Sequence, residues 1–92
     1  MNNLDKIISL ATTAKSLKVM MYDEGNRKMI EMDFSRDKDE IAWVPSLSEI
    51  QIECAAGELS IPVPVDNEGI TYDEESDSFE YITNGIVYTI LF

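Results

Sequence analysis

The 92-residue sequence contains no histidine, the side chain that most often serves as a general base, a proton shuttle or a zinc ligand. It has a single cysteine, Cys54, which excludes an internal disulfide and favours a reducing compartment such as the cytoplasm. No apolar run approaches the roughly 18–20 residues that a membrane-spanning helix needs. These absences predict a cytoplasmic protein that is not an enzyme and holds no cofactor.

Neither a phosphate site nor a metal site is indicated. The four glycines are isolated and lack the spacing of a phosphate-binding loop. Acidic residues surround Gly69, but an EF-hand loop built on that glycine would have Pro64 at its first ligand position, and we expect no helix on either side. We therefore predict no dedicated metal site.

The last fifteen residues, 78–92, contain the clearest structural signal. Asn84-Gly85 lies between two runs rich in aromatic and β-branched residues, and this dipeptide is typical of a type I′ hairpin turn. A turn at these residues also sets the register of the hairpin. The pairs expected on its apolar side are Thr83 with Ile86, Tyr81 with Tyr88, and Phe79 with Ile90.

The rest of the chain predicts one helix followed by short strands. The helix begins at Asn2 or Asn3 and runs to about Leu17, with an apolar stripe on one side. Short apolar runs separated by turn residues then predict strands at 19–22, 27–34, 41–44, 48–54 and 59–65, and a small strand-like island at 70–72 within an acidic segment. Pro62 and Pro64 make 59–65 either an edge strand or an extended strip beside the sheet. The predicted fold is a single α+β domain, 1–92, with the N-terminal helix on a twisted, mainly antiparallel sheet of about six short strands, either open or curled into a small barrel.

Charge is distributed unevenly along the chain. Residues 1–48 hold 7 basic and 8 acidic groups, a net of −1, whereas residues 49–92 hold none and 10, a net of −10, which together make the formal −11. Solvated acids that keep a small protein soluble are the simpler interpretation. Concentrating like charges, however, destabilises the compact state, and solubility does not require it. We therefore expect a partner protein with a basic surface, and no direct contact with nucleic acid, whose phosphates would be repelled.

The candidate partner-binding residues are outward acids of the predicted strands, the acids of the 66–77 segment, and one aromatic anchor beside them. If the strands share one sheet, these acids merge into one negative surface. The set is Glu49, Glu53, Asp66, Glu68, Tyr72, Asp73, Glu74, Glu75, Asp77 and Glu80.

No motif of a known family is present. In size and charge alone the chain resembles the small, acidic proteins with which phages and mobile elements occupy the nucleic-acid groove of a host enzyme, including CRISPR inhibitors and other DNA mimics. The resemblance implies a simple mechanism. Carboxylates stand in for phosphates, pair with Lys and Arg of the partner, and exclude its DNA or RNA by competition.

The alternative is a structural or assembly protein, such as a small component of a virion or an oligomer, that associates through an apolar sheet face. The outer side of the terminal hairpin and a cluster of methionines on the first two strands are its candidate contacts, and a homo-oligomer therefore stays open. Met20 and Met21 point to opposite faces of their strand, and so do Met29 and Met32, so one of each pair is expected outward. These residues are Met20, Met21, Met29, Met32, Ile82, Val87 and Leu91.

Overall fold

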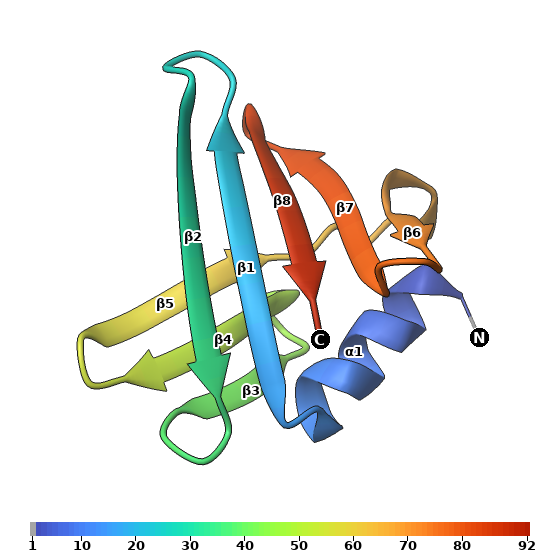
Figure 1. Ribbon diagram of the computed structural model, residues 1–92. Coiled ribbons are helices and arrows are strands. Elements are labelled where there is room, and N and C mark those ends of the chain that lie inside the picture. Colours follow the sequence, from blue (N-terminus) through green and yellow to red (C-terminus); the bar gives the residue numbers. More distant parts are fainter. Residues whose placement is uncertain (1) are drawn as a thin grey trace.

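The computed structural model describes residues 2–92, in which one α-helix and one short 3-10 helix accompany eight strands in two antiparallel sheets (Figure 1). One sheet has five strands in the order β2-β1-β8-β7-β6, and the other has three in the order β3-β4-β5. The elements are α1 (Asn3–Thr13), β1 (Ser16–Asp23), β2 (Lys28–Ser35), β3 (Glu40–Val44), β4 (Glu49–Cys54), β5 (Gly57–Pro62), η1 (Asn67–Gly69), β6 (Thr71–Asp73), β7 (Ser78–Thr83) and β8 (Ile86–Leu91).

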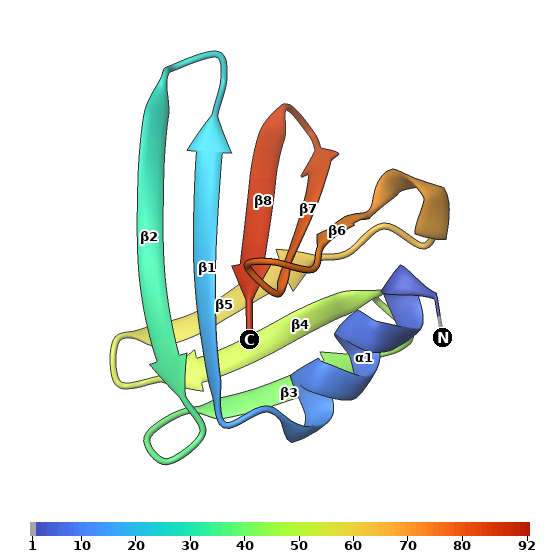
Figure 2. The same ribbon diagram turned by 45° about the vertical axis from the view of Figure 1, so that its right-hand side comes forward.

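The predicted α+β class, with one N-terminal helix and antiparallel strands, is confirmed. The expected count of about six strands and the small barrel are wrong. β8 pairs with β1 and β7, whereas β3, β4 and β5 pair only among themselves, so the strands divide into two open sheets. The strands of the two sheets run across one another in both views (Figures 1 and 2).

The hydrophobic core lies between the two sheets and beneath α1. It draws buried side chains from every layer, including Ile7 of α1, Val19 of β1, Ile50 of β4 and Phe79 of β7. One hydrogen bond joins the sheets directly, because the Tyr81 hydroxyl on β7 donates to the Pro62 carbonyl oxygen on β5 at 2.7 Å. Buried polar groups need such partners, so this bond favours one arrangement of the layers.

Helix α1 begins where the sequence predicts and ends earlier. The Asn2 side chain accepts a hydrogen bond from the Asp5 N–H at 2.8 Å, a standard N-cap. The helix stops at Thr13, and Leu17 is a buried residue of β1, so the expected end at about Leu17 is wrong. Leu17 and Val19 are buried and Lys18 between them is partly exposed, which is the alternation of a strand. The apolar residues near Leu17 therefore fit a strand as well as the end of a helix.

The side chain of Arg36, which follows β2, forms hydrogen bonds with the C-terminal end of the helix. Its guanidinium donates to the carbonyl oxygens of Ala11 at 2.8 Å and Ala14 at 2.7 Å, and to that of Ile41 on β3 at 3.0 Å. A basic side chain distant in sequence therefore satisfies the terminal carbonyls, and no basic residue lies in the helix's last turn.

The terminal hairpin is confirmed in turn and register. Asn84 and Gly85 both have positive φ, 53° and 77°, and the three predicted pairs occur as expected.

The β4–β5 hairpin is tighter than predicted. Cys54 pairs with Gly57, so that Ala55-Ala56 alone forms the turn and β5 starts two residues before the expected Leu59. β5 lies at the edge of its sheet, as predicted, and ends at Pro62, three residues before the expected end.

Candidate functional site

Three glutamates lie side by side on the outer face of the three-stranded sheet. Glu53, near the end of the central strand β4, pairs with Glu40 of β3 on one side and with Glu58 of β5 on the other. All three side chains are exposed. Because neighbouring strands are about 4.8 Å apart, the three carboxylates form one short line across the sheet. We call Glu40, Glu53 and Glu58 the glutamate row.

The strands that carry the glutamate row bear no basic side chain. The sequence has no basic residue after position 38, so β3, β4 and β5 carry none. Glu49 adds a fourth carboxylate to this face and accepts a hydrogen bond from the Gln51 side chain at 2.7 Å. A shallow hollow of about 170 Å³ opens beside the row, lined by the three glutamates together with Ala42, Gln51, Ile52, Leu59 and Ser60.

An ion pair lies on the other sheet. Across residues 2–92, the contact between the Lys18 ammonium and the Glu31 carboxylate, at 2.8 Å, is the one salt bridge within 4.0 Å. The hydrogen bond to Glu31 and the charge of that carboxylate raise the pKa of Lys18. The glutamate row therefore differs from Glu31 in having no cation bound to it.

A second acidic surface is the turn between β6 and β7. The Asp73 carboxylate accepts the Glu75 N–H at 3.0 Å, and Asp77 has a positive φ of 53°. The Tyr72 hydroxyl donates to the Asp77 carboxylate at 2.6 Å, and this hydrogen bond is the main reason why the pKa of Tyr72 is raised. Asp73 and Asp77 thus build the turn, while the side chains of Glu74 and its neighbour are exposed.

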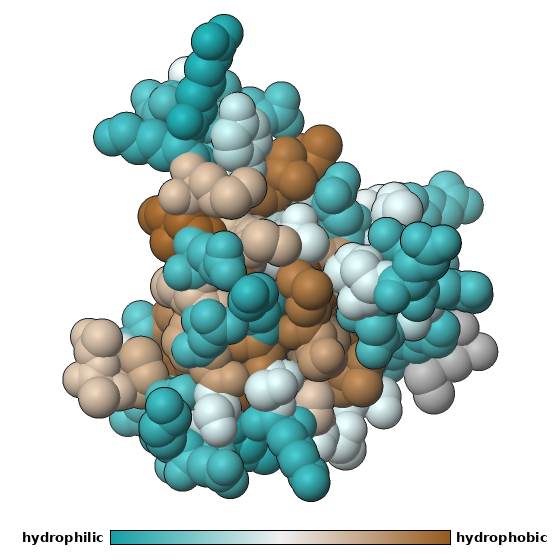
Figure 3. All heavy atoms as spheres, in the orientation of Figure 1, coloured by the Kyte–Doolittle hydropathy of each residue, from teal (hydrophilic) through white to brown (hydrophobic). Residues whose placement is uncertain are grey.

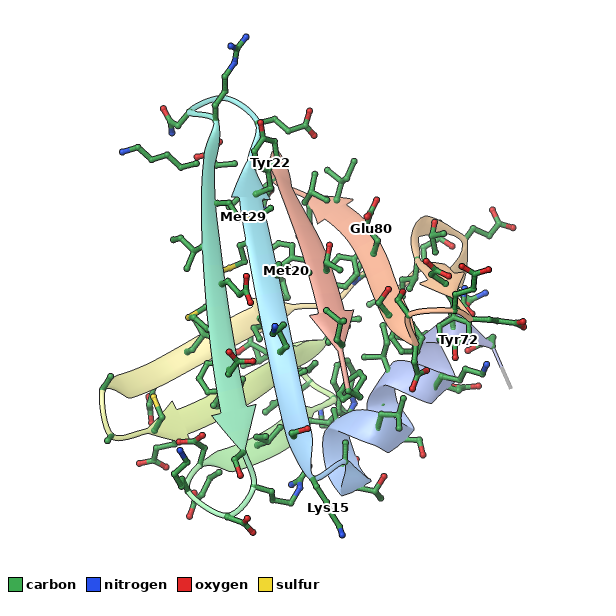
Figure 4. The ribbon with its side chains drawn as sticks, viewed as in Figure 1. Lys15, Met20, Tyr22, Met29, Tyr72 and Glu80 are labelled. Atoms are coloured by element: carbon green, nitrogen blue, oxygen red, sulfur yellow. The ribbon has the colours of Figure 1, made fainter. Side chains whose placement is uncertain are left out.

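Tyr72 is half-buried, in contrast to the exposed anchor that the sequence suggested. Its ring lies 4.8 Å from that of Phe79, and the Lys6 ammonium of α1 lies 4.2 Å above the ring centroid. A hollow of about 270 Å³ opens between α1 and this end of the sheet, with Leu10 and Asp77 also in its lining. Figure 4 shows Tyr72 beside the helix.

Asp66 and Glu68 belong to a structural loop. The Asp66 carboxylate accepts the Glu68 N–H at 3.0 Å and caps the 3-10 helix η1. Next to them, the Asn67 side chain accepts the Leu4 N–H at 3.0 Å, and the Asn3 side chain donates to the Ile70 carbonyl oxygen at 2.7 Å. This loop therefore ties the start of α1 to the five-stranded sheet.

The candidate residues are consequently divided between two sheets. Glu49 and Glu53 face outward from the three-stranded sheet, whereas Glu80 and Asp73 lie on the outer side of the five-stranded sheet. One continuous negative surface was expected only if these strands shared one sheet, and they do not. The sequence interpretation also missed Glu40 and Glu58. A two-residue turn at Ala55-Ala56 would have placed Glu58 opposite Glu53, because loop length sets hairpin register.

The outer side of the five-stranded sheet carries an apolar row at its hairpin end. Met29, Tyr22, Val87 and Ile82 occupy matching positions on four neighbouring strands, and we call these four residues the apolar row. Figure 3 shows apolar side chains gathered over this part of the sheet, below the hydrophilic β1–β2 turn, and Figure 4 shows where Tyr22 and Met29 lie. Met20 shares this outer side, whereas Met21 and Met32 pack against the core, which confirms the expected alternation of the methionines.

Comparison with known proteins finds no match to a family model, to a curated protein or to a solved structure. In the part of the chain that the structure describes, no helix is long and apolar enough to cross a membrane. Over the same residues, no three potential ligands are grouped so that they could hold a metal ion. The two acidic surfaces and the exposed parts of the larger sheet are therefore the features of this molecule that bear on function.

Proposed function

We propose that this chain is a small, acidic, non-catalytic binding protein that docks on the basic surface of a nucleic-acid-binding partner and blocks it. The glutamate row is the observation that carries this proposal. Like charges placed directly opposite one another on neighbouring strands destabilise a sheet, and alternating charges would avoid the cost. A basic partner would turn this repulsion into attraction.

The mechanism follows from the chemistry of the row. Carboxylates on neighbouring strands, which lie about 4.8 Å apart, present acceptors to Arg and Lys side chains, which form their strongest hydrogen bonds with ionised acceptors. The sheet is already ordered, so docking costs little conformational entropy. Lys or Arg side chains that bind Glu40, Glu53 and Glu58 are unable to bind phosphates at the same time. The partner's DNA or RNA is then excluded by competition.

The β6–β7 turn supplies the second contact in this proposal. The exposed Glu74 and Glu75 add negative potential on the other sheet, and with it electrostatic attraction that speeds association. The wider assignment, to phage or mobile-element inhibitors of the CRISPR-inhibitor kind that act in the cytoplasm, rests on size and charge. The unpaired Cys54 supports the same compartment.

The test uses two variants of equal charge. In the row variant, Glu40, Glu53 and Glu58 become glutamine; in the control, Glu24→Gln, Glu31→Gln and Asp37→Asn remove three exposed acids elsewhere. Each carries −11 plus 3, a net of −8. Immobilised protein is mixed with a cytoplasmic lysate at low and high salt, and the captured proteins are identified by mass spectrometry.

We expect the wild type and the control to retain a nucleic-acid-binding protein at low salt. High salt, added DNA or RNA, and the row substitutions should each release it, because screening and competition act on the same contacts. Equal capture by the row variant would contradict the role of the glutamates. Recovery of the chain alone, as a salt-resistant oligomer, would favour the assembly alternative, which the apolar row supports.

A further inference from the structure

Strand β2 is an edge of the five-stranded sheet that nothing covers in the described residues. It pairs one for one with β1 over its whole length, with no bulge, and no other strand pairs with its outer side. The other edge strands of the two sheets are less able to accept a further strand. β5 ends in Pro62, β6 has three residues, and β3 lies against α1. Because edge strands present unpaired N–H and C=O groups, β2 is the edge best able to accept another strand.

The upper half of β2 also exposes apolar side chains on both sides. Met29 is 61% exposed on the outer face of the sheet, and Ile30 is 54% exposed on the inner face. Both views show the β1–β2 hairpin rising beyond the three-stranded sheet (Figures 1 and 2), which agrees with the exposure of Ile30. A strand added to this edge would gain backbone hydrogen bonds together with apolar contacts on either face.

We propose that the β2 edge binds β2 of a second copy of this chain, in antiparallel orientation, so that the two five-stranded sheets become continuous. Charge determines the choice of occupant. The chain as a whole carries −11, but the β1–β2 hairpin, residues 16–35, holds three basic and four acidic groups, a net of −1. Two copies of a strongly acidic protein repel each other least when they meet at this hairpin.

The order of charges along the edge is complementary to itself. Arg27 immediately precedes β2 and Lys28 begins it, whereas Glu31 and Asp33 lie farther along the strand. Antiparallel pairing places the basic end of one copy beside the acidic end of the other. A twofold axis perpendicular to the sheet also pairs residues of the same face.

The register follows from the same charges. With Ile30 opposite Ile30 of the second copy, Arg27 faces Asp33 across the axis and five residues of β2 are paired. A register centred on Glu31 would place two glutamates opposite each other, and one centred on Met32 would place Glu31 opposite Asp33. A register centred on Met29 pairs only three residues of β2. We therefore assign the axis to Ile30.

Five paired residues on each side make a small interface. Stable complexes bury more than about 1,000 Å², so we expect a reversible dimer whose population rises with protein concentration. The main contacts are backbone hydrogen bonds and the apolar groups of Met29, Ile30 and Met32, which salt screens little. This inference is independent of the glutamate row, which lies on the other sheet.

Sedimentation velocity over a concentration series tests the edge. The wild type should shift toward a dimer as concentration rises, and Ile30→Lys should remain a monomer because two lysines would face each other at the axis. Ile82→Lys is the matched control, since Ile82 is 61% exposed on β7 of the same sheet but distant from the edge. This variant should dimerise like the wild type.

Two results would overturn the proposal. A wild type that stays monomeric up to about 1 mM would exclude a dimer of any useful affinity. Loss of the dimer in Ile82→Lys but not in Ile30→Lys would place the contact on the face of the sheet, through the apolar row. Circular dichroism of both variants confirms that each remains folded, as expected of exposed positions.

Cysteine cross-linking tests the register separately. In a Cys54→Ala background, Ile30→Cys places two thiols opposite each other at the axis, where cross-strand Cβ atoms lie about 4.5–5.5 Å apart, near disulfide geometry. Met32→Cys in the same background places them farther apart. We expect faster disulfide-linked dimer formation with Ile30→Cys. Faster cross-linking of Met32→Cys would overturn the assigned axis.

Discussion

Replacing Glu53 by glutamine should stabilise the fold, because Glu53 takes part in two like-charge contacts, with Glu40 on β3 and Glu58 on β5. With about 6 Å between carboxylates, the Coulomb repulsion in water is about 0.7 kcal/mol for each pair. A Debye length of about 10 Å at 0.1 M salt reduces this to about 0.4 kcal/mol. Removing both contacts should therefore raise the free energy of unfolding by about 0.8 kcal/mol at 0.1 M salt.

Urea denaturation at two salt concentrations measures this gain. At 1 M salt the Debye length falls to about 3 Å, and the stabilisation should shrink to about 0.2 kcal/mol. Glu31→Gln is the matched control, because Glu31 is also exposed but binds Lys18 at 2.8 Å. Its neutralisation should be neutral or cost up to about 1 kcal/mol. A Glu53→Gln protein that is no more stable than the wild type, or whose gain is unaffected by salt, would refute the reasoning.

Substitutions at three further positions, Arg36, Asn84 and Tyr81, test the fold. Arg36→Ala should cost about 2–4 kcal/mol in urea denaturation, because three carbonyl groups lose a charged donor, and Arg36→Lys should recover only part of the loss; an unchanged midpoint would contradict this role. Asn84→Pro should lower the melting temperature far more than conversion of Asp73, Glu74, Glu75 and Asp77 together to their amides, since proline does not adopt the φ of 53° at this turn; equal effects would count against it. Burial raises the pKa of Tyr81, so the unfolded chain releases the Tyr81 proton at lower pH than the folded chain does. The contribution of Tyr81 to the free energy of unfolding should therefore be fully present below a pH of about 10 and decrease above it. Tyr81→Phe should cost about 1 kcal/mol at neutral pH, because the hydrogen bond to the Pro62 carbonyl oxygen is lost, and it should weaken the decrease in stability at alkaline pH. If the free energy of unfolding changes equally with pH in the wild type and in Tyr81→Phe between pH 8 and 11, the effect is excluded.

The parts of the fold that the sequence predicted are those set by neighbouring residues. Asn84-Gly85 requires positive φ at two successive positions, and this local demand determines the register of the whole terminal hairpin. The start of α1 at the Asn2 cap is equally local. The end of the helix depends on Arg36, which lies 22 residues beyond Ala14, and no helical pattern near Leu17 contains that information.

The division into two sheets could not be predicted for the same reason. β8 pairs with β1 across most of the chain length, whereas β3, β4 and β5 pair with their sequence neighbours. Both arrangements have the same alternation of apolar and polar residues, so periodicity does not distinguish them. The two acidic surfaces follow from this division. Glu53 and Glu80 would share a face only if their strands shared a sheet, and the pairing of β8 with β1 and β7 separates them.

The proposed dimer affects how the glutamate row would meet a partner. A twofold axis perpendicular to the five-stranded sheet keeps both three-stranded sheets on the same side, so one dimer would present two rows together. A long basic groove that reaches both rows would gain avidity of about 10²–10⁴ over one row. Ile30→Lys, on the other sheet, should therefore weaken capture of such a partner. It should leave unchanged the affinity for a short lysine peptide that reaches only one row. Ile82→Lys adds the same charge and should affect neither measurement. Loss of peptide binding in Ile30→Lys would mean that Ile30 touches the partner directly, and the argument from two rows would then fail.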